Sequence, residues 1–309
     1  MSENRKLLEM NVPMWFDGKS INEALFCEDF LRTRQIIFAN GAFFTPDGRV
    51  TDDLPLRGEI FEELKYCAVN NIPRKISNII EIMKLAAHVE DFPPEQDRIH
   101  LANGTLMLDG TFTEGKPDIV RNRLPVFYRP DTPKPVLWLS FLNGLLYPED
   151  IPTLQEFIGY CLIPSNKGQR MMVIKGNGGE GKSQIGAVLG QMLGSSMKDG
   201  SIGKISENRF ARADLEHILL CVDDDMRMET SVYKGYKQDK IEMRGDRAEM
   251  SDFPLYLNTV AGGLDRRDQT IGGFSFVVKI YAVPVVEIIG QLLYLLGRYG
   301  FNTQFGDCL

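Results

Sequence analysis

The sequence has few of the residues from which structural metal sites and disulfide frameworks are built. Its five cysteines are scattered without any C-x-x-C pair, and it has only three histidines. This distribution argues against a zinc site and against a disulfide framework. Cys67, Cys161 and Cys221 lie in apolar periodic stretches, so we expect buried, reduced thiols at these positions.

Long hydrophobic runs are also missing. The apolar stretch Ile280–Leu296 is interrupted by Pro284, Glu287 and Gln291, and it is short for a bilayer-spanning helix of about 20 residues. We therefore interpret it as a core helix. The first ten residues show no apolar segment of the kind found in secretory signals. These features predict a cytosolic protein without a membrane partner.

Neither sign of charge dominates the chain. Its 309 residues include 35 Lys+Arg and 42 Asp+Glu, which gives a formal net charge of -7. This balance excludes a uniformly basic nucleic-acid coat protein, although it is compatible with a local basic channel. A hydrophobic fraction of 43% and a charged fraction of 25% are typical of a globular chain and exclude a largely disordered or collagen-like one.

The first part of the sequence predicts a small α+β domain. Two Asn-Gly dipeptides, at 40–41 and 103–104, each stand between apolar segments and indicate β-hairpins. Apolar periodicity predicts helices over roughly 58–69 and 75–87. The S-x-x-E pattern that begins at Ser20 predicts the cap of an earlier helix.

A proline-rich segment predicts the boundary between two domains. Three prolines fall within Arg129–Pro135, which is typical of a stiff linker. We therefore place the α+β domain at residues 1–133 and a larger domain at residues 134–309. The larger domain begins with two predicted helices between residues 136 and 162, which prolines separate.

A glycine-rich loop is the strongest functional pattern in the sequence. An apolar strand pattern at Met171–Lys175 precedes the loop Gly176–Ser183, which matches G-x-x-x-x-G-K-[ST] in full. A helical pattern follows as far as Leu193, and Gly194 stands where a helix-ending glycine is expected. Strand, loop and helix in this order predict a nucleotide phosphate-binding loop, with a chance glycine-rich turn as the alternative.

Each residue type in this loop suits phosphate binding. Glycines let backbone N–H groups approach phosphate oxygens without a Cβ in the way, and the following helix adds the positive end of its dipole. Lys182 is expected to reach the β- and γ-phosphates of ATP, and the Ser183 hydroxyl to ligate Mg²⁺. The predicted nucleotide-binding residues are Gly176, Asn177, Gly178, Gly179, Glu180, Gly181, Lys182 and Ser183.

An acidic segment follows the loop at a distance of about forty residues. The five apolar residues Ile218–Val222 suit a buried parallel strand, and three aspartates come directly after them. Carboxylates at the tip of such a strand can hold Mg²⁺ opposite Ser183 and polarise the attacking water. We assign these roles to Asp223 and Asp224, with Asp225 as the substitute if the register shifts by one. An acidic loop without function is the alternative.

The stretch from residue 99 to residue 227 resembles the phage and plasmid primase–helicase family. The motor of that family belongs to the superfamily 3 helicases and is related to the poxvirus replication NTPase. The segments that carry the resemblance are Asn103–Leu108, Arg123–Tyr128, Phe157–Leu162, the phosphate loop and Arg209–Leu215.

This resemblance implies an α/β fold with an AAA+-like P-loop NTPase domain, built on a parallel sheet and preceded by a smaller helicase-associated α+β domain. It implies a DNA helicase that hydrolyses ATP with Mg²⁺ and translocates on single-stranded or forked DNA as a homo-oligomeric ring, usually a hexamer. The setting would be the cytoplasm of a bacterial host or phage-infected cell, with a replication initiator or a primase as a further partner.

Two features depart from the family pattern. Glu180 stands where the family usually has asparagine, which puts a carboxylate beside the phosphates. Residues 228–309 match only loosely. There Asn258 corresponds to a sensor residue at the end of a strand, and Arg266 and Arg267 to arginines that reach the ATP of a neighbouring subunit. Solvated loop residues are the alternative for all three, and a truncation or an altered reading frame in this part stays open.

Basic residues between the two motifs are candidates for DNA contact. Lys198, Lys204, Arg209 and Arg212 cluster in the sequence, with Phe210 among them. In a ring-shaped motor, basic residues that line the channel follow the DNA backbone. An ordinary mixed-charge surface is one alternative. A position of either arginine beside the ATP of an adjacent subunit is another.

Two other function classes remain open. One is a phosphoryl transferase on a small substrate, for which the sequence shows no lid or acceptor pocket. The other is a catalytically impaired, nucleotide-binding replication initiator or regulatory remnant, which the atypical last part favours. Primase activity is not expected, because no strand before residue 130 carries spaced carboxylates for two metals. Asp91, Glu95 and Asp97 lie in a proline-containing loop, where we expect solvated side chains.

Overall fold

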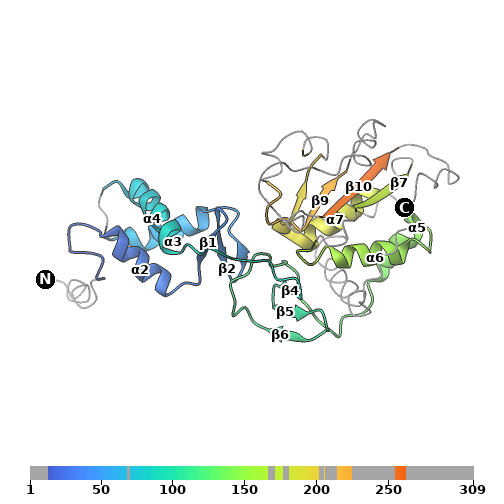
Figure 1. Cartoon of the computed structure of the whole chain (residues 1–309), viewed down its shortest axis with the longest axis horizontal. Helices are drawn as coiled ribbons and strands as arrows, with labels where there is room; N and C mark the ends of the chain where they lie inside the picture. Colours follow the sequence, from blue (N-terminus) through green and yellow to red (C-terminus); the bar gives the residue numbers. More distant parts are fainter. Residues whose placement is uncertain are drawn as a thin grey trace. The chain divides into compact units, whose positions relative to one another are not determined.

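The computed structural model describes residues 13–67, 70–165, 171–176, 181–201, 205, 214–224 and 255–261. The chain divides into two compact units, Met1–Pro93 with Lys116–Arg121 and Pro94–Gly115 with Asn122–Leu309. Both units combine helices with strands, so the expectation of a mixed α/β chain is confirmed in this general form (Figure 1).

Helices and a small antiparallel sheet share one core in the first unit. The elements are α2 (Glu23–Arg32), α3 (Leu54–Leu64), α4 (Ile72–Ala86), β1 (Ile37–Ala39), β2 (Ala42–Thr45) and β3 (Gly48–Arg49), with the strands in the order β1-β2-β3. The apolar stripe that the sequence predicts for the second helix is confirmed on α4. Its buried residues are Ile76, Ile79, Ile80 and Met83.

The first Asn-Gly dipeptide forms the predicted hairpin turn. Ala39 and Ala42 are paired across β1 and β2, and the two residues between them complete the turn. Asn40 has φ +47° and Gly41 has φ +78°. Two consecutive positive φ angles are what a two-residue hairpin turn needs, and Asn-Gly adopts them with little strain.

The predicted helix cap at Ser20 is wrong. Asn22 caps α2 instead, because its side-chain oxygen accepts hydrogen bonds from the N–H groups of Ala24 and Leu25, each at 3.2 Å. The Ser20 hydroxyl donates to the Asp17 carboxylate at 2.7 Å. An asparagine next to the first helical residue reaches the unpaired N–H groups that a serine two positions earlier does not.

The second unit begins with a three-stranded antiparallel sheet followed by two helices. These elements are β4 (Arg98–Leu101), β5 (Gly104–Met107), β6 (Phe112–Glu114), α5 (Val136–Leu145) and α6 (Ile151–Tyr160). The second predicted hairpin and both predicted helices are thus confirmed.

One buried cluster joins this sheet to the helices that follow it. Leu101, Leu106 and Leu124 belong to the same cluster as Trp138 and Leu142 of α5. The proposed linker before residue 136 therefore connects parts that share a core. The division into a helicase-associated domain and a motor domain at residue 133 stays a prediction.

A parallel sheet comes next in the described part of the second unit. Its strands are β7 (Met171–Gly176), β8 (Met197–Asp199), β9 (Leu220–Asp223) and β10 (Leu255–Ala261), and each neighbouring pair is parallel in the order β7-β10-β9-β8. The helix α7 (Lys182–Leu193) and the short 3-10 helix η1 (Gly194–Ser196) connect β7 to β8, as parallel strands require a crossover. Figure 1 shows β7, β10 and β9 side by side, with α7 beside them.

The strand β9 and the end of α7 agree with their sequence patterns. All four residues of β9 are buried, as expected of a continuous apolar run in a parallel sheet. α7 ends at Gly194, whose φ of +54° is the backbone conformation that favours glycine after a helix.

The described cysteines are free thiols, and most of them are buried. Cys27, Cys161 and Cys221 are buried free thiols, and Cys67 is half-buried. Within the part of the chain that the structure describes, no helix is both long enough and apolar enough to cross a membrane. The core helix predicted at Ile280–Leu296 lies outside the described residues.

Candidate nucleotide-binding site

The connection from β7 to α7 contains the predicted phosphate loop. Gly176 is the last residue of β7, and Gly181 is the N-cap of α7. Gly181 has φ +92°, a left-handed conformation that residues with a Cβ rarely adopt. The loop therefore enters the helix through a conformation that favours glycine at this position. Residues 177–180, which include the predicted Asn177, Gly178, Gly179 and Glu180, lie outside the described residues.

The first turn of α7 combines a buried lysine with an exposed serine. The Lys182 side chain is only 8% exposed, whereas Ser183 is exposed. Lysine is rarely buried to this degree without a compensating group. The N–H groups of a first helical turn have no partner within the helix and carry the positive end of its dipole. A buried ammonium group at this end makes the site suited to an anion such as phosphate.

The same helix packs against the strand that carries the acidic residues. A Cβ added at Gly186 would lie 3.6 Å from Cγ1 of Val222. Gly186 is four residues after Lys182, which is about one helical turn or 6 Å along the helix axis. Val222 immediately precedes Asp223 in β9. α7 thus contacts β9 one turn after Lys182 and one residue before Asp223.

The first two predicted carboxylates differ in exposure. Asp223 is the last residue of β9 and is 8% exposed, whereas Asp224 follows the strand and is exposed. A buried carboxylate is costly unless positive charge or hydrogen bonds surround it. Asp223 therefore matches the expected position of a metal-holding carboxylate better than its neighbour does. Asp225 lies outside the described residues.

The strand β10 brings the predicted sensor residue next to Asp223. The register pairs Asn258 with Asp223 of β9 on one side and with Val173 of β7 on the other. Neighbouring strands lie about 4.8 Å apart, so one strand spacing separates the backbones of Asn258 and Asp223. The strand predicted around this residue is confirmed, but Asn258 does not stand at its end, because β10 continues for three more residues to Ala261. The sensor role of Asn258 stays a prediction. Arg266 and Arg267 lie outside the described residues.

The residue types at the start of α7 and at the end of β9 are of the kind that a magnesium nucleotide requires. Mg²⁺ prefers oxygen ligands and is usually held by one or two protein oxygens together with substrate phosphates. The Ser183 hydroxyl and the Asp223 carboxylate are oxygen donors of this kind. Lys182 would supply a positive charge for the phosphates.

The predicted DNA-contacting residues fall mostly outside the described part of the chain. Lys204, Arg209 and Arg212 lie outside the described residues. Lys198 of β8, from the same cluster, forms an ion pair with Asp214 at 2.9 Å. Among the described residues of this cluster, Lys198 is the only cation, and its ammonium group is paired with a nearby carboxylate.

The cysteine beside Asp223 does not have the properties of a nucleophile. Burial raises the pKa of the Cys221 thiol to about 11, and the negative charge of Asp223 adds to this effect. The thiol is therefore protonated at neutral pH, whereas the thiolate is the reactive form. Its Sγ atom lies 3.9 Å from the carbonyl oxygen of Gly200, a contact typical of a structural cysteine.

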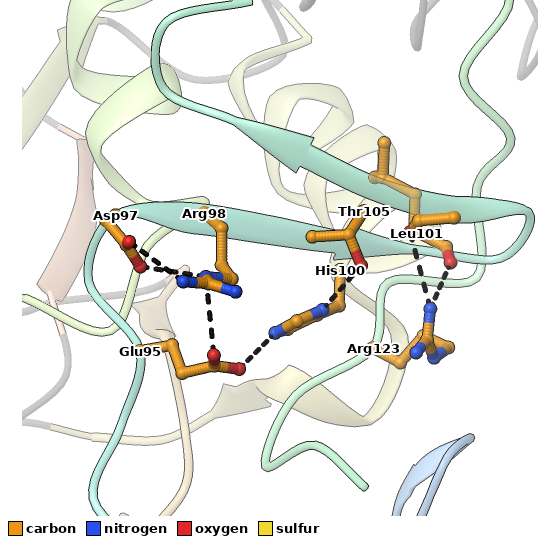
Figure 2. Close-up of polar contacts among 8 residues, drawn as sticks. Glu95, Asp97, Arg98, His100, Leu101, Thr105 and Arg123 are labelled. Carbon is orange, nitrogen blue, oxygen red and sulfur yellow. Dashed lines mark hydrogen bonds and ion pairs between the residues drawn. The ribbon is translucent and has the colours of Figure 1, made fainter. Parts of the chain in front are cut away.

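A second polar cluster lies on the β4–β5 hairpin and was not expected from the sequence. Nε2 of His100 lies 2.6 Å from Oε2 of Glu95, and Nδ1 lies 3.0 Å from Oγ1 of Thr105 (Figure 2). Nε of Arg98 lies 3.3 Å from Oε1 of Glu95 and 2.9 Å from Oδ1 of Asp97. Glu95 is exposed, as the sequence analysis expects of this loop, and it also contacts two neighbouring side chains.

The environment of this histidine favours its neutral form. Burial lowers the pKa of His100, and the charges of Arg123 and Arg98 act in the same direction, while Glu95 opposes them. Arg123 donates through Nη1 to the carbonyl oxygen of Leu101 at 2.7 Å and fixes the turn of the hairpin. The cross-strand pair of His100 and Thr105 could have been found from the Asn-Gly hairpin register.

Comparison with known proteins adds a distant structural likeness. No protein-family model matches the chain, and no curated protein matches it. An A-form apo structure of the NrS-1 C-terminal region aligns with a TM-score of 0.46 and 10% identity over 86% of this chain and 68% of that chain. Another apo structure of that region has a TM-score of 0.41 and 13% identity over 78% and 58%.

A further A-form structure of the same NrS-1 region has a TM-score of 0.42 and 11% identity, over 89% of this chain and 68% of that chain. This chain therefore spans between 58% and 68% of these structures. All three TM-scores are below 0.5, so the functional argument rests on the residues of this chain.

Proposed function

We propose that this chain binds and hydrolyses ATP with Mg²⁺ at the carboxyl edge of its parallel sheet. One observation carries the proposal: the register places Asn258 beside Asp223, while α7 packs its first turns against the same strand. Ligands of open α/β sheets bind outside the carboxyl ends of the strands. Asp223 is level with Val173, three residues before the end of β7 where the glycine-rich loop begins. The loop motif and the acidic strand thus belong to one sheet, and the proposed site lies beyond the carboxyl ends of its strands.

Each residue has a role that its position supports. Lys182 and the first N–H groups of α7 would hold the β- and γ-phosphates and stabilise the charge that develops during phosphoryl transfer. Ser183 and Asp223 would hold the Mg²⁺, which neutralises phosphate charge and orients the γ-phosphate. Asp224 or Asn258 would orient the water that attacks the γ-phosphorus in line with the leaving diphosphate.

The proposal extends to a DNA helicase of a phage or plasmid replication system, on the strength of the family resemblance in the sequence. In that function the chain would form a ring on single-stranded or forked DNA. Arg266 and Arg267 would act on the ATP of a neighbouring subunit, and Lys204, Arg209 and Arg212 would follow the DNA backbone. A replication initiator or a primase would be a further partner.

The test is ATP hydrolysis by the purified chain with and without single-stranded DNA, beside Lys182→Ala. We expect DNA-stimulated turnover that falls by about 100-fold or more in the variant, because the lysine contributes several kcal/mol of transition-state stabilisation. A circular dichroism spectrum equal to that of the wild type serves as the folding control. Unchanged turnover in Lys182→Ala would overturn the proposed site.

The other outcomes identify the competing functions. ATP binding without hydrolysis, unchanged by Asp224→Asn, would point to a nucleotide-dependent initiator or regulatory remnant. Turnover that saturates with a small acceptor and ignores DNA would point to a phosphoryl transferase.

A further inference from the structure

An aromatic side chain of α5 lies against the glycine that begins α7. A Cβ placed on Gly181 would lie 3.4 Å from Cε2 and 3.9 Å from Cζ of Phe141. These are ordinary van der Waals distances, so the ring closes the space beside the Gly181 backbone. Phe141 is 40 residues earlier in the chain, so no local sequence pattern indicates this contact.

The rest of α5 holds this ring in place. Trp138, one turn earlier, is 9% exposed, and its ring centroid lies 5.6 Å from that of Phe141 at an interplanar angle of 31°. Leu142 is fully buried in the cluster that also contains Ile185 and Leu189 of α7. Phe141 itself is half-buried. The ring is thus fixed on one side by the core and contacts the phosphate-loop end on the other.

We infer that Phe141 is a positioning residue for the phosphate-binding end of α7, an inference that rests on the proposed function. Gly181 has a left-handed φ of +92° and no side chain that could pack against its neighbours. The ring of Phe141 packs against this backbone instead and restricts its movement. The direction of the first N–H groups of α7 and of Lys182 depends on this backbone. Preorganised donors bind an anion better than donors that must first be ordered.

The backbone conformation at position 181 disfavours any residue other than glycine. A side chain there would be strained by the positive φ, and its Cβ would occupy the space beside the ring. The aromatic ring of Phe141 on α5 therefore fills the space that a side chain at position 181 would face.

The test compares variants by the affinity of the full chain for a fluorescent ATP analogue with Mg²⁺. Phe141→Ala is expected to raise the Kd by about tenfold, which corresponds to about 1.4 kcal/mol. Phe141→Leu keeps apolar bulk at the contact but loses the ring, and it should raise the Kd by about threefold. The matched control is Leu145→Ala on the same helix, half-buried against the same core, which should change the Kd by less than about twofold.

A double-mutant cycle separates positioning from general loss of stability. Gly181→Ala is expected to weaken binding by itself, and adding Phe141→Ala should then cost much less than it does in the wild type, because both changes act on one backbone segment. Thermal unfolding of the nucleotide-free variants reports the structural cost. A Kd for Phe141→Ala no higher than that for Leu145→Ala, or full additivity with Gly181→Ala, overturns the inference.

Failure of the inference is distinguishable from failure of the proposed function. If Lys182→Ala binds the analogue as tightly as the wild type, the proposed function fails. If Lys182→Ala loses binding while Phe141→Ala keeps it, only the role of Phe141 is wrong. Should Phe141→Ala not fold, the comparison of Phe141→Leu with the wild type decides, and an unchanged Kd in that variant overturns the inference.

Discussion

Two polar groups of the second unit differ in how far apart their residues lie in the sequence. The hairpin cluster of Glu95, His100 and Thr105 comes from one short stretch, and its atoms contact one another at 2.6 and 3.0 Å. The candidate nucleotide site instead joins the start of α7 to Asp223 and Asn258 on two strands that are separated widely in the sequence.

This difference indicates different purposes. In the hairpin cluster, both nitrogens of His100 have partners within the same supersecondary unit, so the cluster stabilises the hairpin on its own. At the parallel sheet, a buried lysine at the start of α7 and a buried carboxylate at the end of β9 come from separate elements. Such convergence at the carboxyl ends of strands is typical of a ligand site.

The largest expected effect tests the candidate nucleotide site. Asp223→Asn should lower ATP hydrolysis by about 100-fold or more, because the amide cannot replace the charge of a metal-holding carboxylate, while nucleotide binding changes much less. Steady-state hydrolysis and binding of a fluorescent ATP analogue measure the two quantities. Asp224→Asn is the matched control with an expected smaller loss. A larger loss in Asp224→Asn would reverse the two assignments.

A smaller effect tests the hairpin side. His100→Ala should lower the free energy of unfolding by about 1–3 kcal/mol, because it removes a buried side chain and leaves Glu95 and Thr105 without their shared partner. Urea denaturation measures this change, and nucleotide affinity should stay the same. Asp97→Ala, at an exposed carboxylate of the same cluster, should stay within about 0.5 kcal/mol of the wild type. A loss of nucleotide affinity in His100→Ala would contradict the distinction between the two groups.

The smallest expected effect is a pH dependence of stability. Because burial lowers the pKa of His100 in the folded state, the unfolded chain takes up the proton first as the pH falls. Stability is therefore lost as the pH falls below the ordinary histidine value of about 6.5, until the folded-state pKa is reached. His100→Gln does not titrate and should lose less stability between about pH 7.5 and about pH 5.5 than the wild type does. Parallel losses in the two proteins would show that this histidine has no part in the effect.

Local features of the fold were predictable because neighbouring residues decide them. The apolar stripe of α4 follows from helical periodicity, and the first hairpin turn follows from the positive φ angles that Asn40 and Gly41 adopt readily. The strand, loop and helix around the phosphate loop follow in the same way. Where two local signals competed, as at Ser20 and Asn22, the pattern alone gave the wrong cap, because cap geometry depends on which residue is closest to the first free N–H groups.

The candidate site was predictable in its residue types but not in its assembly. The sequence indicates that Lys182 and Asp223 have suitable chemistry, and it places the strands in the order β7, β8, β9, β10 along the chain. In space the order is β7-β10-β9-β8, and this order puts Asn258 beside Asp223. The order of the strands in the sheet is decided by backbone pairing between segments that are far apart in the sequence. The spacing of residues within one segment does not reveal it.

By itself, the sequence determined which groups this protein has for binding a nucleotide, because the chemistry of glycine, lysine, serine and aspartate is a property of single residues and their neighbours. The tertiary structure alone decided that Phe141 lies against Gly181 and that Glu95 and Thr105 share His100. Such contacts depend on how helices and strands pack, which is a balance of burial and hydrogen bonding over the whole unit.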